Sequence, residues 1–195
     1  MISIAVTGGI ACGKSLFGQM LRGLGADVVD ADEIVRSLHR PGGKGAELVA
    51  SNFGGAYLLP DGGTDREHLG SLVFSDASAR RRLNDLLHPI IRNELLAWKA
   101  SPSATPFKVA QISLLFEEGW DGDWDLSVSI EAPEQVRCSR LLARGMSPEQ
   151  ARNRIAAQMT SAQRAEKADV VIQNDATVAE LQLAARRLFL QMENK

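Results

Sequence analysis

The residues with the clearest chemical potential lie in one loop near the N-terminus, residues 8–15, which read GGIACGKS. Their spacing fits G-x-x-x-x-G-K-[ST], a pattern in which successive backbone N–H groups cradle phosphate oxygens. Gly8 and Gly13 allow the sharp turns and the close approach of backbone to an anion. Lys14 brings positive charge to the β- and γ-phosphates, and Ser15 offers a hydroxyl to Mg²⁺. The loop therefore predicts a site for a nucleoside triphosphate.

The neighbouring residues favour this interpretation over a glycine-rich turn that matches by chance. Residues 2–7 are short, apolar and β-branched, as expected of a buried strand, and a helical pattern follows the loop. A helix that begins at Lys14 places its positive dipole end under the phosphates. Cys12 needs no redox role there, because free cysteine often behaves as a small hydrophobic residue.

The remaining chain alternates strands with helices. Apolar runs predict five strands, at residues 2–7, 26–29, 107–112, 126–130 and 170–172. Helical patterns begin at Lys14 and recur at residues 34–38, 47–53, 65–74, 76–100, 133–144, 147–159 and 177–192. Pro89 is expected to restart or kink the fifth of these helices. Residues 54–63 are expected to form a loop or hairpin, and residues 101–106 a linker.

This alternation predicts an α/β fold, with a parallel five-stranded sheet covered by helices on both faces. Residues 33–100 contain almost no strand pattern, which indicates a helical excursion between the second and third strands. Such an excursion would overhang the carboxyl ends of the strands, where open α/β sheets bind ligands.

Composition limits the class of protein. The 195 residues suit one domain, and 45% hydrophobic residues suffice for a full core. A net charge of −2 gives no overall attraction to nucleic acid or to an anionic membrane. Two distant cysteines offer no disulfide framework, and no apolar run approaches the roughly 20 residues of a spanning helix. We expect a cytoplasmic monomer that binds small molecules, without nucleic-acid or membrane partners.

Two carboxylates follow the second predicted strand. Asp30 with Glu33 fits a capping box, and acidic residues favour the first turn of a helix. A kinase also needs a carboxylate that orients the acceptor hydroxyl and takes its proton. The residues alone leave both interpretations open, and they are compatible if Asp30 caps the helix and Asp32 is catalytic.

Basic residues gather late in the chain, and residues 136–167 carry a net excess of five positive charges. Arg137, Arg140 and Arg144 are expected to share one helical face. One interpretation is a solvated helix face. The other is a basic flap opposite the phosphate loop, where positive charge stabilises phosphoryl transfer and closure excludes water. No aromatic residues interleave with these charges, which disfavours a nucleic-acid surface.

Taken together, these blocks resemble the dephospho-CoA kinase family. The resemblance is carried by the loop at residues 7–15, by Asp30-Ala31-Asp32 with Arg36, by His88-Pro89-x-Ile91-Arg92, by Leu114-Leu115-Phe116-Glu117, by Arg154-Ile155-x-x-Gln158 and by Ala168-Asp169-x-x-Ile172-x-Asn174. The blocks follow the family's order and span nearly the whole chain. Ala11-Cys12 departs from the family pattern, which usually has Gly-Ser in the loop.

The resemblance implies a P-loop NTPase fold in three parts. These are a nucleotide core (about 1–32, 105–135 and 168–195), a helical acceptor-binding insertion (about 33–104) and a helical lid (about 136–167). It also implies transfer of the ATP γ-phosphate to the ribose 3′-hydroxyl of dephospho-CoA, giving CoA and ADP. The alternatives are another small-molecule P-loop kinase, of nucleoside monophosphate, shikimate or gluconate type, or a nucleotide-binding switch that is not an enzyme.

The resemblance further implies roles for individual residues. Catalysis would involve Asp32, Lys14 and Arg140. ATP would be bound by Gly9, Ala11, Cys12, Gly13, Lys14, Ser15, Leu16, Arg140 and Asn174. Dephospho-CoA would be bound by Asp32, Arg36, His88, Arg92, Leu115 and Glu117. Ser15 would be the protein ligand of Mg²⁺, and ATP and Mg²⁺ are the expected cofactors. His88 could instead serve only to satisfy a helix break before Pro89.

Overall fold

The computed structural model describes residues 1–105 and 107–193, so Pro106, the end of the expected linker, lies outside the described residues. The described chain divides into two compact units, Met1–Asp30 with Pro102–Lys195, and Ala31–Ser101. We call the first the sheet unit and the second the helical unit. No described helix combines the length and the apolar character needed to cross a membrane.

The sheet unit is built on a five-stranded sheet with the order β2-β3-β1-β4-β5, and every adjacent pair of strands is parallel. Its strands are β1 (Ile2–Thr7), β2 (Asp27–Asp30), β3 (Phe107–Gln111), β4 (Leu126–Glu131) and β5 (Val170–Gln173). Its helices are α1 (Lys14–Gly23), η2 (Asp121–Asp123), α6 (Glu134–Leu142), α7 (Pro148–Ala156), α8 (Ser161–Lys167) and α9 (Val178–Glu193). The predicted parallel α/β sheet is therefore confirmed, with strand boundaries within one residue of those expected.

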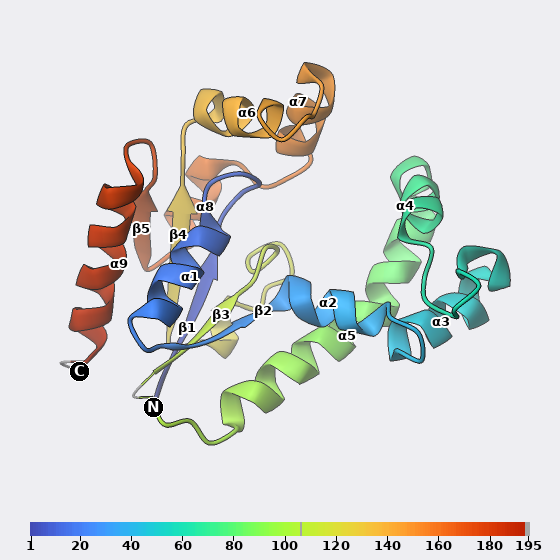
Figure 1. Cartoon of the computed structure of the whole chain (residues 1–195), viewed down its shortest axis with the longest axis horizontal. Helices are drawn as coiled ribbons and strands as arrows, with labels where there is room; N and C mark the ends of the chain where they lie inside the picture. Colours follow the sequence, from blue (N-terminus) through green and yellow to red (C-terminus); the bar gives the residue numbers. More distant parts are fainter. Residues whose placement is uncertain (106, 194–195) are drawn as a thin grey trace. The chain divides into compact units, whose positions relative to one another are not determined.

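Side-chain alternation along β4 shows how helices cover both faces of this sheet. Val128 and Ile130 belong to the main hydrophobic core, which also holds Phe17 of α1 and Leu181 of α9. Helices α1 and α9 pack against each other on that face (Figure 1). Glu131, on the alternate face of the strand, pairs with a side chain of α8. Strand β4 thus contributes apolar side chains to the core that holds α1 and α9 on one face, and a polar contact with α8 on the other.

The helical unit contains no named strand among its described residues. It consists of α2 (Ala31–Leu38), α3 (Lys44–Phe53), η1 (Gly55–Tyr57), α4 (Arg66–Ser75) and α5 (Ala77–Ala100). Residues 54–63 form the short η1 turn and a loop, which an isolated antiparallel bridge between Leu58 and Thr64 closes. Helix α5 packs against α2, α3 and α4.

Two helix predictions are corrected, and a third is narrowed. Helix α5 does not restart at Pro89 but continues through it, because the packing of its buried residues, including Leu87 and Ile91, outweighs one lost backbone hydrogen bond; a kink at Pro89 stays a prediction. Helix α6 ends at Leu142, so Arg144 lies beyond it and does not share its face. The expected helix at 147–159 ends at Ala156, and a separate helix, α8, was missed.

Two buried serines, near the starts of β1 and β4, each donate two hydrogen bonds to a single aspartate oxygen. Asp125 Oδ2 accepts hydrogen bonds from Ser3 N at 2.8 Å and Ser3 Oγ at 2.6 Å. Asp169 Oδ2 accepts from Ser127 N at 2.8 Å and Ser127 Oγ at 2.6 Å. Asp125 directly precedes β4, which pairs with β1, the strand of Ser3. Asp169 directly precedes β5, which pairs with β4, the strand of Ser127. These hydrogen bonds lower the pKa of Asp169 and align the start of β5 with β4.

We predict that Asp169→Ala lowers the free energy of unfolding by about 1–3 kcal/mol, because Ser127 is buried and loses the acceptor of two donors. Urea denaturation at neutral pH measures the change. Asp169→Asn is the matched control, since its amide oxygen still accepts, and we expect it to keep most of the stability. Equal stability of Asp169→Ala and the wild-type chain would contradict the role of this contact.

Candidate functional site

The P-loop, residues 8–15, connects β1 to α1 as predicted, and α1 begins at Lys14. Gly13 precedes the helix with a φ of 102°, a left-handed conformation that glycine adopts without steric cost. The helix therefore starts directly beneath the loop, and its first N–H groups and dipole favour an anion there.

The Lys14 ammonium group is the strongest sign that this loop can bind an anion. Lys14 is 7% exposed, and its Nζ has no hydrogen-bond partner among the described residues. Asp30 Oδ1, at the end of β2, lies 3.9 Å away and offsets part of the charge. A buried cation without a hydrogen bond is costly, and phosphate oxygens would supply the acceptors that it lacks.

Three successive carbonyl groups of the P-loop are held by side chains from distant parts of the sequence. Ile10 O accepts from Arg137 Nε at 2.9 Å, and Ala11 O accepts from Arg140 Nη1 at 3.1 Å. Cys12 O accepts from Asn174 Nδ2 at 2.7 Å. Arg140 also donates through Nη2 to Asn174 O at 3.0 Å, which ties these donors together. Of the predicted nucleotide residues, Arg140 and Asn174 are thus brought to the P-loop.

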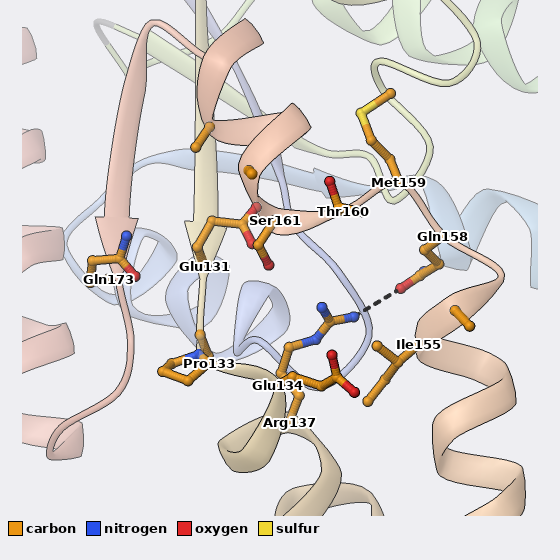
Figure 2. Close-up of a pocket in the computed structure, with 14 residues that line it drawn as sticks. Glu131, Pro133, Glu134, Arg137, Ile155, Gln158, Met159, Thr160, Ser161 and Gln173 are labelled. Atoms are coloured by element: carbon orange, nitrogen blue, oxygen red, sulfur yellow. Dashed lines mark hydrogen bonds between the residues drawn. The ribbon is translucent and has the colours of Figure 1, made fainter.

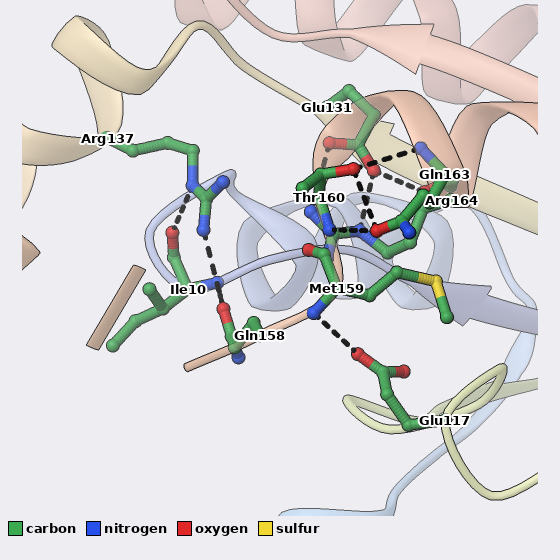
Figure 3. A network of polar contacts seen from close by, with 10 residues as sticks. Ile10, Glu117, Glu131, Arg137, Gln158, Met159, Thr160, Gln163 and Arg164 are labelled. Atoms are coloured by element: carbon green, nitrogen blue, oxygen red, sulfur yellow. Dashed lines mark hydrogen bonds and ion pairs between the residues drawn. The ribbon is translucent and has the colours of Figure 1, made fainter. Parts of the chain in front are cut away.

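The first peptides of the loop approach two guanidinium groups closely. A Cβ atom on Gly9 would lie 2.5 Å from Arg137 Nη2 and 2.7 Å from Arg164 Nη2. Ile10 N donates to Gln158 Oε1 at 2.7 Å, and the same oxygen lies 3.4 Å from Arg137 Nη2 (Figure 3). A side chain at position 9 would therefore displace one or both guanidinium groups, and Arg137 is a buried residue rather than part of a solvated helix face.

Arg164 forms the main buried ion pair of this region. Its Nε lies 2.8 Å from Glu131 Oε1, its Nη2 lies 3.3 Å from Oε2, and its Nη1 donates to Met159 O (Figure 3). Burial raises the pKa of Glu131, but hydrogen bonds from Arg164, Ser161 and Ser129 outweigh it, and the net pKa is lowered. The pair joins the end of β4 to α8 behind the P-loop.

Ala11 has a left-handed backbone with a φ of 62°, the one positive φ among the described non-glycine residues. This conformation costs about 1–2 kcal/mol for a residue with a Cβ. The Ala11 side chain is buried in a small hydrophobic cluster with Leu141 of α6 and Ala151 of α7. The methyl group that strains the loop is thus packed against these helices.

Cys12 is fully buried in the main core. Burial is the largest influence on its thiol and raises its pKa, although the Lys14 N–H acts in the opposite direction. The thiol is therefore protonated at neutral pH, in agreement with the predicted role of a small apolar filler.

A cavity of about 550 Å³ lies beside this network, between the ends of β4 and β5 and helices α6, α7 and α8 (Figure 2). Arg137 and Gln158 form part of its wall, together with Glu131, Glu134 and Thr160. None of the P-loop residues is among those that line it. The cavity is thus separated from the anion-binding face of the loop.

The predicted acceptor residues divide between the two units. Asp32 and Arg36 lie one turn apart on α2, both exposed, and Arg36 Nη2 lies 3.7 Å from Glu33 Oε1. His88 and Arg92 lie one turn apart on α5, which packs against α2. These four residues all belong to the helical unit.

Leu115 and Glu117 belong instead to the sheet unit. Leu115 is fully buried, so neither its side chain nor its backbone is exposed. The Glu117 side chain is exposed, and its Oε1 accepts from Met159 N at 3.4 Å. Ser15 and Leu16 are exposed at the start of α1.

Comparison with known proteins now identifies the family. The sequence pattern of the family described as dephospho-CoA kinase matches residues 2–180. The chain belongs to the dephospho-CoA kinase family. It is 40% identical to the dephospho-CoA kinase of Geobacter sulfurreducens over 182 residues, covering 92% of each chain. Its function is that of this family of ATP-dependent kinases, the final step of coenzyme A biosynthesis, as the sequence resemblance predicted.

Solved structures also resemble this chain over nearly its whole length. A crystal structure of TT1252 from Thermus thermophilus superposes with a TM-score of 0.83 at 31% identity, covering 97% of both chains. Dephospho-CoA kinase from Campylobacter jejuni gives a TM-score of 0.71 at 27% identity, covering 98% of this chain and 97% of that one. Shikimate kinase from Acinetobacter baumannii, at 18% identity and a TM-score of 0.57, shares the fold alone.

Sequence reasoning missed several residues that contact the P-loop or form the ion pair beside it. Arg137 and Arg164 were recognised only as members of a basic segment, and Gln158 only as part of a motif. Glu131 was not noticed at all. The one available signal was the Arg154-Ile155-x-x-Gln158 pattern, because a polar residue at a fixed place in a family motif indicates a specific contact.

We predict that Arg164→Leu lowers the free energy of unfolding by about 3–5 kcal/mol at neutral pH, because it leaves the Glu131 carboxylate buried without its partner. The double variant Glu131→Leu with Arg164→Leu should lose less, since no unpaired charge is left. Urea denaturation of the three chains checks this. A double variant less stable than Arg164→Leu would contradict it.

The same pair predicts a pH dependence. The folded-state pKa of Glu131 is lowered, so its contribution to stability is present above the unfolded-state pKa and is lost as the pH falls through the folded-state value. The double variant should therefore show a shallower acid limb in a plot of unfolding free energy against pH. Parallel acid limbs would exclude Glu131 as a source of acid sensitivity.

Proposed function

We propose that the P-loop binds the phosphates of ATP and that the γ-phosphate passes to the ribose 3′-hydroxyl of dephospho-CoA. The observation that carries this proposal is the buried Lys14 ammonium group, which has no hydrogen-bond partner among the described residues. Its position at the start of α1 fits a role at the β- and γ-phosphates. The carbonyl groups of Ile10, Ala11 and Cys12 are satisfied from outside the loop, which leaves N–H groups for the phosphates.

Ser15 and Asp30 are the residues that we assign to Mg²⁺. Ser15 is exposed at the second position of α1, and Asp30 lies beside Lys14. Both offer hard oxygen atoms, which suit this ion, either directly or through water. The ion would neutralise charge on the phosphate oxygens. Among the described residues no cluster of three His, Cys, Asp or Glu side chains forms a metal cage, so the phosphates and water would complete the coordination.

The remaining roles follow the predicted organisation. The acceptor-binding insertion, about residues 33–104, contributes Arg36, His88 and Arg92 to the binding of dephospho-CoA, and Asp32 belongs to the same set. Leu115 and Glu117, which belong to the sheet unit, are assigned to the same ligand. The lid is the segment of about residues 136–167, and Arg140 contacts the nucleotide from it while Asn174 lies at the adenine. The exposed guanidinium of Arg36 and the aligned His88 and Arg92 suit an anionic acceptor. We also propose that the chain acts as a monomer, which light scattering checks.

The direct test is formation of ADP and CoA from Mg·ATP by the purified chain, with and without dephospho-CoA. We expect ADP release that depends on dephospho-CoA and on Mg²⁺, and a product phosphorylated on the ribose. Release with shikimate, gluconate or a nucleoside monophosphate in place of dephospho-CoA would contradict the assignment of the acceptor. Release without added Mg²⁺, in the presence of EDTA, would contradict the assignment of the metal.

We predict that Asp32→Asn lowers kcat by about 10²–10⁴-fold while ATP still binds, because the amide can no longer take the proton of the acceptor hydroxyl. Asp85→Asn is the matched control: Asp85 is an exposed carboxylate of α5 in the same unit, outside the proposed site. Steady-state kinetics and calorimetric ATP binding measure both variants. Near wild-type turnover of Asp32→Asn would remove Asp32 from the role of base.

A further inference from the structure

Residues 9–12 of the P-loop form a tight turn whose central peptide has a defined orientation. Cys12 N donates to Gly9 O at 3.1 Å, so Ile10 and Ala11 are the two central residues. Ala11 has a φ of 62°, whereas Ile10 is not among the residues with positive φ. This combination belongs to a type II turn, in which the third residue requires a positive φ. The related type I turn needs no positive φ and has the central peptide rotated by about half a turn.

The type II orientation is held from both ends of Ile10. Its carbonyl oxygen accepts from Arg137 Nε at 2.9 Å, and its N–H donates to Gln158 Oε1 at 2.7 Å. Because a trans peptide is planar, the Ala11 N–H points away from Ile10 O and therefore away from Arg137. No described residue accepts a hydrogen bond from this N–H. It is thus available to a ligand on the other side of the loop.

Alanine is a poor residue for this turn. A side chain at the third position opposes the positive φ, and the cost given above corresponds to roughly a five- to thirtyfold bias toward the alternative turn. In that turn the rotated peptide would present Ile10 O where the Ala11 N–H now points. A carbonyl oxygen on the phosphate side would repel an anion instead of binding it.

We propose that Arg137 is a positioning residue for ATP: its Nε–H fixes the Ile10–Ala11 peptide so that the Ala11 N–H faces the phosphates. The proposal rests on nucleotide binding at the P-loop. Arg137 has this role because Ala11 occupies a position that favours glycine. Gln158 restrains the preceding Gly9–Ile10 peptide through the Ile10 N–H, and the Ala11 methyl, packed on Leu141, adds a third restraint on the turn.

The surroundings of Arg137 fit a role at the loop. The residue is 3% exposed, and no carboxylate of the described residues forms an ion pair with its guanidinium. Its hydrogen bonds go to Ile10 O and Gln158 Oε1, both of which belong to this peptide contact. Burial and the neighbouring Arg164 charge lower its pKa. Arg137 thus binds the Ile10–Ala11 peptide directly and the Gly9–Ile10 peptide through Gln158, so it is placed to set the orientation of both peptides that flank Ile10.

The test is a double-mutant cycle between Arg137 and Ala11. We expect Arg137→Met to raise the KM for ATP and the Kd for ADP about tenfold, with a smaller change in kcat, because the bias toward the rotated peptide is then unopposed. Ala11→Gly is the second single variant of the cycle, and its own KM for ATP is the reference for the double variant, since glycine accepts the positive φ without strain. The double variant should recover most of the lost affinity.

A matched pair at Gln158 keeps the proposal testable if Arg137→Met does not fold. Gln158→Leu removes the acceptor of the Ile10 N–H, whereas Gln158→Glu retains an oxygen there. We expect weaker ATP binding only for Gln158→Leu, rescue of that loss by Ala11→Gly, and an unchanged KM for dephospho-CoA.

The outcomes separate this inference from the proposed function. Loss of affinity that Ala11→Gly does not rescue, in either background, would overturn the positioning role. A lowered kcat with unchanged ATP affinity in Arg137→Met would also overturn it, because Arg137 would then act on the transferring phosphate. Failure of the wild-type chain to bind nucleotide would contradict the proposed function itself.

Discussion

The P-loop depends on one constraint: its carbonyl oxygens must be satisfied on one side of the chain so that its N–H groups stay available on the other. A loop without regular secondary structure cannot meet this requirement by itself. The donors that do so are Arg137, Arg140 and the Asn174 amide. Arginine suits the task because its guanidinium group only donates, and its planar fork reaches two acceptors at once.

This arrangement buries charge, and the surrounding helices are arranged to compensate for it. Arg164 pairs with both oxygens of Glu131 at the end of β4, so its position fixes α8 against the sheet. Arg137 has carbonyl oxygens instead of a carboxylate partner, so its burial depends on the geometry of Ile10 and Gln158. The start of α6, the end of α7 and the start of α8 are therefore positioned relative to a single loop. A change in the position of any of these helices would therefore alter the conformation of the P-loop.

The sequence predicted the parts of the structure that local patterns determine. The P-loop, the start of α1 and the five strands follow from motif and apolar runs, because each is specified by neighbouring residues. The burial of Arg137 could not be predicted in this way, since its acceptor, Ile10 O, is 127 residues away. Helix α8 was missed because it has only seven residues, although the Thr160-x-x-Gln163 capping box that begins it is a recognisable signal. A restart of α5 at Pro89 does not occur, because the packing of the helix outweighs the local cost of the proline.

Ala11 shows how a local rule can be broken within a coherent structure. A glycine there would relax the turn, but it would also leave the loop free to sample other conformations when the site is empty. Alanine restricts those conformations, and burial of its methyl group against Leu141 and Ala151 offsets part of the strain. As a result, the conformation of the loop depends on contacts with residues outside it. The conformation of the loop is therefore coupled to the packing of α6 and α7. A ligand that stabilises this loop conformation must also stabilise the packed position of these helices.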